Sequence, residues 1–539
     1  MTLIRTACAL LALILVNTST PGQSFSKRKK QFETDFASND QKVRAKAIAA
    51  ISEHGHPETV RYLLTVIRDV TDKLTEARAR WAESTVKRTA LRREESRLRQ
   101  LMTSGKIGKK QWERAKAELV EVEKRCKAYR RTIDLDSDIG VTLRKAVGWT
   151  VARCSDAHKR DAFNAITTAY RRAKEIEDKA DILRVMVWVD VPEMVEILGR
   201  ETRHREAPTR VAALRAIEER GGLRALRPAV ACLKDESWQV RAQAIRILRK
   251  VGGNEAAKAL CNALEGEDGR LVTDAVTALR KLTGQNFHDN VHLWREWLDK
   301  NGDALAQPTE IANAPPLPKK RPAAVKRGAR QHAGTGFYGI NTRSKHIVYV
   351  IDFSGSMRGL LAPPRGRRGP VQTDTSPAKV GGKRKVDGVV TELLKSIDAL
   401  PKDGTFNVIL FETGVTVWSD KMVKANQKSK KAIRQWVLER GPLGATDLFG
   451  GLEKSFGFAG RGSFDRHYAS AVDTIFLLSD GSPTAGRIQA TAEILREIRA
   501  LNDLRRIALH CVGLGRAINA GFLRRLAEEN DGEFVHVTK

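Results

Sequence analysis

The stretch His346-Ile347-Val348-Tyr349-Val350-Ile351-Asp352-Phe353-Ser354-Gly355-Ser356-Met357 decides the fold of the C-terminal part of this chain. Its first six residues are mostly β-branched or apolar, which is typical of a strand buried on both faces of a parallel sheet. Such sheets bind ligands beyond the carboxyl ends of their strands, where Asp352, Ser354 and Ser356 fall. One carboxylate and two hydroxyls are hard oxygen donors, suited to Mg²⁺ or Mn²⁺.

Two later stretches carry side chains of the same kind. Thr446 lies in a Gly- and Pro-containing loop ahead of a predicted helix, and Asp480 follows the apolar run 474–478. Together with the first stretch they resemble the metal-ion-dependent adhesion site of the von Willebrand factor A-like family, whose pattern is present in full as Asp352, Ser354, Ser356, Thr446 and Asp480. The resemblance covers residues 336–539 and implies an α/β, doubly wound, Rossmann-like domain.

The resemblance also implies how these residues bind a metal ion. In the family the serine hydroxyls and the threonine or an aspartate ligate the ion, and the remaining carboxylate is held through water. Ser354 and Ser356 would thus bind Mg²⁺ (or Mn²⁺) directly, Thr446 would be the exchangeable ligand, and Asp352 and Asp480 would anchor the shell. An acidic side chain of a protein partner would fill the open position.

Nothing in the sequence indicates catalysis. The three loops carry no positioned histidine and no second carboxylate cluster for a two-metal site. The chain also contains neither a phosphate-loop motif nor a Gly-x-Ser-x-Gly elbow. We therefore expect no catalytic residues, no organic cofactor and no enzymatic activity.

Residues 25–304 are rich in Ala, Leu and Arg with helical periodicity, and they contain an internal repeat. The segments 210–217, 241–248 and 272–279 match one another, and Ala213, Ala244 and Ala275 are 31 residues apart. This period predicts two-helix units stacked in an all-α solenoid, and the pattern resembles HEAT repeats. Both a concave protein-binding surface and a rigid spacer are compatible with it.

Three segments interrupt or join these domains. Residues 70–133 predict an antiparallel coiled-coil hairpin inserted into the solenoid, turning at 104–108, with Arg88 and Glu95 as misfits on its apolar seam. Residues 305–335 predict a basic, Pro- and Ala-rich linker that stays extended. Residues 358–383 form an Arg-rich insert, either a simple loop or a positive collar at the rim of the metal site.

The N-terminus and the cysteines bear on localisation. Residues 1–24 predict a signal peptide, because Arg5 precedes the apolar run 7–16 and small and polar residues follow it. That run is shorter than the roughly 20 residues that span a bilayer, so we expect a secreted or periplasmic (cell-envelope) protein without a membrane span after cleavage. The remaining cysteines are odd in number and without Cys-x-x-Cys spacing, which favours buried thiols.

Three classes of function follow from these features. The leading hypothesis is an exported interaction scaffold that binds a protein partner through its metal-dependent site. The formal net charge of +31 keeps open a polyanion-binding protein that contacts nucleic acid or acidic polysaccharide, although its basic segments lack aromatic residues for base stacking. A third alternative is an A-like subunit of an ATPase- or chelatase-like machine. The sequence predicts no oligomeric state.

Overall fold

The computed structural model describes residues 24–189, 191–220, 223–305, 335–360, 384–459, 471–515 and 518–538. These residues belong to two compact units, Met1–Glu196 and Ile197–Lys539. All but the last residue of the predicted signal peptide and nearly all of the predicted linker and insert lie outside the described residues. An all-helical N-terminal region precedes a mixed α/β domain with a mostly parallel sheet, which confirms the predicted fold class.

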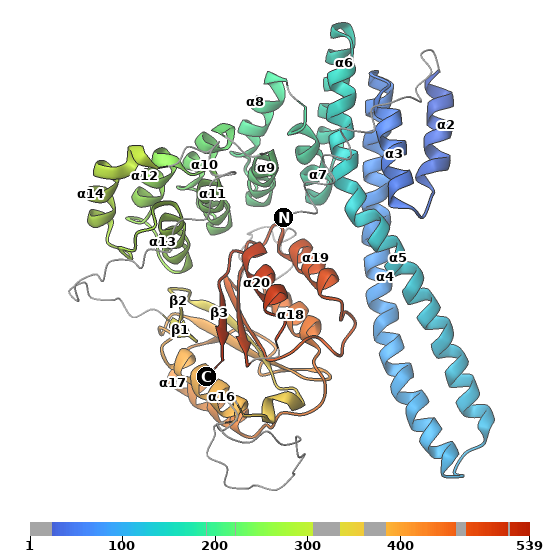
Figure 1. Ribbon diagram of the computed structural model, residues 1–539, viewed down its shortest axis with the longest axis vertical. Coiled ribbons are helices and arrows are strands. Elements are labelled where there is room, and N and C mark those ends of the chain that lie inside the picture. Colours follow the sequence, from blue (N-terminus) through green and yellow to red (C-terminus); the bar gives the residue numbers. More distant parts are fainter. Residues whose placement is uncertain are drawn as a thin grey trace. The chain divides into compact units, whose positions relative to one another are not determined.

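Helices α4 and α5 form the long antiparallel pair of the first unit (Figure 1). Helix α4 (Pro57–Thr103) has 47 residues and is roughly 70 Å long at 1.5 Å per residue. The chain turns at 104–108 and returns as α5 (Lys109–Arg153). Both helices extend beyond the predicted limits of the hairpin, 70 and 133, because their far ends pack against neighbouring helices of the same unit.

The remaining helices of this region are shorter. Those before the boundary between the units are α2 (Phe25–Phe36), α3 (Gln41–Ser52), α6 (Asp156–Arg172) and α7 (Ile176–Met186), and α8 (Pro192–Glu201) crosses that boundary. No helix in the described ranges combines the length and the apolar character needed to cross a bilayer. Cys126, Cys154, Cys232, Cys261 and Cys511 are all buried free thiols.

One of the two misfit positions of the hairpin seam has a specific partner. The carboxylate of Glu95 accepts a hydrogen bond of 2.7 Å from the indole Nε1 of Trp112 on the opposite arm. Further along the seam Val122 and Cys126 are buried. A carboxylate is tolerated between the helices here because the tryptophan supplies a donor that an aliphatic seam residue would lack.

The 31-residue repeat is built from α9 (Ala207–Arg220), α11 (Trp238–Val251) and α13 (Arg270–Thr283). Ala213, Ala244 and Ala275 are fully buried, and α11 packs between α9 and α13. Gly284 ends α13 at φ 72°, a left-handed conformation that explains the glycine at this helix stop. The other elements of the repeats are η1 (Leu223–Ala225), α10 (Leu226–Cys232), α12 (Gly253–Ala263), α14 (Val291–Asn301) and η2 (Gly302–Ala304).

The sheet of the α/β domain is organised around β3 (His346–Asp352). Its parallel neighbours are β4 (Thr405–Phe411) and β7 (Thr474–Ser479). The sheet continues in parallel through β8 (Ala508–Leu514) and β9 (Phe534–Val537), whereas β5 (Val415–Val417) and β6 (Val423–Lys424) pair antiparallel with β4. The strand order is β5-β4-β3-β7-β8-β9. A separate hairpin of β1 (Thr335–Phe337) and β2 (Ile340–Thr342), which the sequence did not predict, precedes β3.

Helices cover both faces of this sheet (Figure 1). On one face α16 (Lys385–Asp398) and α17 (Gln427–Leu438) share a core with Tyr349 and Phe476. The layer on the other face consists of α18 (Leu448–Gly457), α19 (Thr491–Asn502) and α20 (Ala520–Glu529). With both faces closed, only the two ends of the strands are left to carry polar sites.

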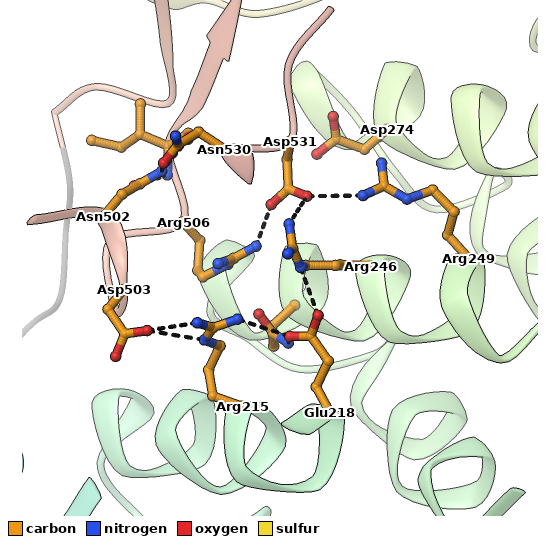
Figure 2. A network of polar contacts seen from close by, with 12 residues as sticks. Arg215, Glu218, Arg246, Arg249, Asp274, Asn502, Asp503, Arg506, Asn530 and Asp531 are labelled. Atoms are coloured by element: carbon orange, nitrogen blue, oxygen red, sulfur yellow. Dashed lines mark hydrogen bonds and ion pairs between the residues drawn. The ribbon is translucent and has the colours of Figure 1, made fainter. Parts of the chain in front are cut away.

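Arginines of the HEAT-like repeats contact the amino-terminal end of this sheet, within the second unit (Figure 2). Arg215 and Arg246 are 31 residues apart and occupy the same repeat position on α9 and α11. Arg215 donates two hydrogen bonds to Asp503, at 2.7 and 3.1 Å, and Arg246 donates one to Asp531 at 2.5 Å. Equivalent arginines of two successive repeats therefore pair with two aspartates of the α/β domain, one that follows α19 and one that follows α20.

Two buried carboxylates hold this network together. Glu218 accepts hydrogen bonds from Arg215 at 2.9 Å and Arg246 at 2.7 Å, and Asp531 also pairs with Arg506. Burial alone would raise the pKa of both carboxyls, but the surrounding cations outweigh it and hold each pKa below its ordinary range. Arg506 and Asp531 both have positive φ, 58° and 57°. Contacts on several sides hold this strained backbone in place.

A further arginine enters the same end of the sheet from α13. Nη1 of Arg270 donates to the carbonyl oxygens of Asp473 at 2.9 Å and Arg506 at 2.5 Å, just before β7 and β8 begin. A buried carbonyl without a partner is costly, and Arg270, which is itself buried, supplies a donor to that of Arg506, whereas the carbonyl of Asp473 also accepts the N–H of Ala508 at 3.0 Å. The sequence left open whether the solenoid binds protein or is a spacer. Part of its surface binds the α/β domain of its own chain.

We expect Asp531→Asn to destabilise the second unit by about 3 kcal/mol, because it leaves buried arginines without their counter-charge. Asparagine tolerates positive φ, so the substitution tests the charge and not the backbone. The matched control Asp398→Asn removes a half-exposed partner of Arg434 and should cost about 1 kcal/mol or less. Denaturant unfolding followed by circular dichroism measures both.

The pH dependence gives a second readout of the same network. Because its folded-state pKa is depressed, Asp531 stabilises the fold fully above its ordinary pKa of 3.8, and that stability is lost as pH falls through the depressed value. The difference between Asp531→Asn and the native protein should therefore stay constant from pH 8 to about pH 5. A difference that disappears at pH 6 would contradict the network as described.

Candidate metal centre

The carboxyl ends of β3 and β7 bring the predicted site residues to the same end of the sheet. Asp352 is the last residue of β3, and Ser354 and Ser356 follow at the start of the short helix η3 (Gly355–Arg358). Asp480 comes directly after β7, the parallel neighbour of β3. Asp352, Ser354 and Asp480 are buried, at 0, 2 and 4% exposure.

A chain of hydrogen bonds links four of the five predicted residues. The backbone N–H of Ser354 donates to Oδ1 of Asp352 at 2.9 Å, and the hydroxyls of Ser354 and Ser356 lie 3.0 Å apart. Ser356 Oγ then donates to Oδ1 of Asp480 at 2.7 Å. Two carboxylates and two hydroxyls thus converge at one point.

The loop of Thr446 is fixed beside them by backbone contacts. The N–H of Gly355 donates to the carbonyl of Gly444 at 3.0 Å, and the N–H of Leu443 donates to the carbonyl of Phe353 at 2.8 Å. The N–H of Thr446 donates to Oγ1 of Thr484 at 3.0 Å. The loop with Thr446 therefore joins both the Asp352 segment and the segment after β7, and Thr446 itself is buried.

Asp352 lies in an unfavourable electrostatic environment. Its burial raises its pKa to about 6, hydrogen bonds from Ser354 and Ser479 oppose this rise, and the charge of Asp480 adds to it. The Ser479 hydroxyl donates to Oδ2 of Asp352 at 2.8 Å and so orients the carboxylate. A cation between the two carboxylates would offset both the burial and their mutual repulsion.

Two residues of the site were missed by the sequence analysis. Ser479 orients Asp352, and Lys385 places its ammonium group 2.6 Å from Oδ2 of Asp480. A serine directly before the aspartate of a buried strand was a usable signal for Ser479. No local signal marked Lys385, because its partner is 95 residues away in the sequence.

The donor set fits the metal that the sequence predicted. All of its donors are oxygens, two from carboxylates and the others from hydroxyls, as Mg²⁺ and Mn²⁺ prefer. In the described residues there is no group of three or more His, Cys, Asp or Glu side chains arranged to hold a metal. A closed nitrogen- or sulfur-rich site of the structural zinc type is thus not found in that part of the chain.

The topology and these three loops define a class of protein. Residues 381–535 match the family model of the von Willebrand factor type A domain, and residues 191–280 match that of HEAT repeats. The chain therefore carries a von Willebrand factor A domain preceded by HEAT repeats. The first match begins after Asp352, Ser354 and Ser356, so it does not extend over that segment.

Relatives with similar sequence match a stretch of this chain about the size of one domain. Inter-alpha-trypsin inhibitor heavy chain H1 from Mesocricetus auratus is 28% identical over 195 residues, which is 36% of this chain and 18% of that protein. Heavy chain H4 from Homo sapiens is 28% identical over 196 residues, again 36% of this chain and 18% of the relative. The chain thus matches less than a fifth of the length of either relative.

Solved structures give the same extent. A von Willebrand factor type A protein from Catenulispora acidiphila is 20% identical with a TM-score of 0.28, over 37% of this chain and 40% of that one. Proximal thread matrix protein 1 from the mussel byssus, a structure with a zinc-occupied metal-ion-dependent adhesion site, is 17% identical with a TM-score of 0.24, over 36% and 41%. Each match spans little more than a third of this chain.

We expect Mg²⁺ or Mn²⁺ to raise the melting temperature of the full chain. A ligand that binds only the folded state adds RT ln(1 + [L]/Kd), about 2.7 kcal/mol at a hundred times Kd. Asp352→Ala should abolish the shift. The exposed Asp420, which lies outside the three loops, provides the control, and Asp420→Ala should retain the shift in full. An equal shift in Asp352→Ala would refute the assignment of the site.

Proposed function

We propose that this protein is an interaction protein that binds a protein partner through a divalent metal ion held at the carboxyl end of its sheet. The observation that carries the proposal is the convergence of Asp352, Ser354, Ser356 and Asp480 on one point beside the Thr446 loop. A dication with only two carboxylates around it stays electrophilic. An acidic side chain of the partner completes its coordination shell.

The surroundings of the site support a protein ligand. Leu443 in the Thr446 loop is 59% exposed, and large apolar side chains at such a position are available for contact with a partner. The opposite end of the strands is occupied by the HEAT repeats of the same chain. The repeats thus contact the amino-terminal end of the strands and leave the carboxyl end, with the metal centre, for the partner.

No enzymatic role is included in the proposal. The loops around Asp352 and Asp480 bring together hydroxyls, carboxylates and one lysine, which suit coordination and charge pairing. We therefore assign these residues a role in binding and not in catalysis.

We expect Thr446→Ala to weaken partner binding strongly while leaving the fold intact, because it removes a metal-site hydroxyl from a loop whose backbone contacts remain. Proteins captured from an extracellular or envelope fraction in Mg²⁺, and released by EDTA, supply the partner. Thr391→Ala removes an exposed threonine hydroxyl on α16 and should bind normally. Surface plasmon resonance at two salt concentrations compares the variants.

The polyanion alternative makes the opposite prediction. Arg365, Arg367 and Arg368 lie in the insert, outside the described residues. Neutralising them should only slow association and flatten its salt dependence, since charge attraction through water is screened over about 10 Å at 0.1 M salt. Loss of binding in this triple variant, with Thr446→Ala unaffected and binding intact in EDTA, would replace our proposal by polyanion binding.

The proposal also includes export from the cytoplasm, which the leader-like residues 1–24 suggest. We expect the native protein to lack this segment and to occur in a secreted or periplasmic fraction. Mass spectrometry of the N-terminus after cell fractionation measures this directly. An intact Met1 on a protein found only in the cytoplasm would rule out export.

A further inference from the structure

A lysine ammonium group sits on one of the two carboxylates of the metal centre. Nζ of Lys385 lies 2.6 Å from Oδ2 of Asp480, with the Lys385 side chain 17% exposed and the Asp480 side chain 0% exposed. Oδ1 of the same carboxylate accepts the hydroxyl of Ser356. Both oxygens of Asp480 are therefore engaged, one of them by a full positive charge.

The position of Lys385 is fixed by three segments of backbone. Lys385 is the first residue of α16, and its N–H donates to the carbonyl of Gly359 at 2.9 Å. An antiparallel bridge pairs Leu360 with Arg384 just outside it. On the other side Gly515 lies against the lysine stem, since a Cβ there would be 3.3 Å from Cε and 3.5 Å from Nζ of Lys385. The ammonium group is thus aimed at Asp480 by the fold.

No second cation serves the site in the described part of the chain. Two basic residues of the adjoining segments have other partners, because Arg358 donates to the carbonyl of Pro442 and Arg384 pairs with Asp387. The oxygens of Asp352 accept hydrogen bonds from Ser354 and Ser479, without an ion pair. Among the described residues, the ammonium group of Lys385 is therefore the positive charge that repels a divalent ion as it approaches Asp480.

We propose that Lys385 is a built-in competitor of the divalent ion, which neutralises Asp480 in the metal-free protein and sets the metal concentration at which the site fills. The inference rests on the proposed metal site and adds the residue that tunes it. A dication in the shell of Asp480 would lie roughly 5 Å from the ammonium group, and even when their repulsion is screened as in bulk water, at a dielectric constant of about 80, it lowers metal affinity by about tenfold.

The matched variants are Lys385→Gln, Lys385→Arg and Lys395→Gln. Lys395 is on the same helix, is 74% exposed and pairs with Glu392, so its replacement changes the net charge equally without touching the site. Isothermal titration with Mn²⁺ should show about tenfold tighter binding for Lys385→Gln. Lys385→Arg and Lys395→Gln should both bind like the native protein.

Thermal melting separates this role from a merely structural one. In EDTA Lys385→Gln should melt below the native protein, because Asp480 is left buried without a counter-charge. In saturating Mn²⁺ it should gain more stability than the native protein gains. A variant that is less stable by the same amount in both conditions would show that Lys385 only supports the fold.

The outcomes also distinguish this inference from the proposed function. Equal or weaker Mn²⁺ affinity in Lys385→Gln, with normal binding by the native protein, would overturn the competition and leave the metal site standing. If neither the native protein nor Lys385→Gln binds Mn²⁺, both proposals fail together. If Lys395→Gln binds Mn²⁺ as tightly as Lys385→Gln does, the gain in affinity comes from the change in net charge alone. That result would overturn the specific role of Lys385.

Discussion

The burial of β3 on both faces is the constraint on which the rest of the second unit depends. A strand that is apolar on both sides must be covered by helices on both sides, and α16 and α17 on one face and α18 to α20 on the other do this. Polar function is then confined to the two ends of the strands. One end holds the metal centre at Asp352, and the other end receives Arg270 and its neighbours from the HEAT repeats.

Each end of the sheet buries a carboxylate, and the surroundings of the two carboxylates differ in charge. Asp531 is buried among arginines, so its pKa is depressed and it stays ionised as part of the architecture. Asp352 is buried with hydroxyl and amide donors only, so its pKa is raised to about 6. A buried carboxylate whose negative charge is balanced by neighbouring arginines serves the structure. One whose charge is not balanced by protein cations remains available to bind a cation from solution.

Much of this arrangement was accessible from the sequence, because it depends on local patterns. The apolar run of β3 predicted its burial, and the parallel sheet that it implied placed Asp352 and Asp480 at the same end. The 31-residue repeat predicted α9, α11 and α13. The contacts that escaped prediction are non-local. Arg215 and Arg246 resemble ordinary solvent-facing helix residues until Asp503 and Asp531, more than 280 positions later, are placed beside them. Lys385 escaped for the same reason.

Arg215 pairs with Asp503 and Arg246 pairs with Asp531, so the spacing of these two aspartates at the end of the sheet matches the spacing of successive repeats. Repeat arrays change length by duplication or loss of whole units, and each such event shifts every later residue by one period. A unit duplicated ahead of α9 would leave this register unchanged. A copy of the α11 unit inserted after α11 would still leave an arginine at Asp531, but it would move α13, and with it Arg270, one period away from the carbonyl oxygens of Asp473 and Arg506. The contacts of α9, α11 and α13 with the A domain therefore fix the number of repeat units between Arg215 and Arg270.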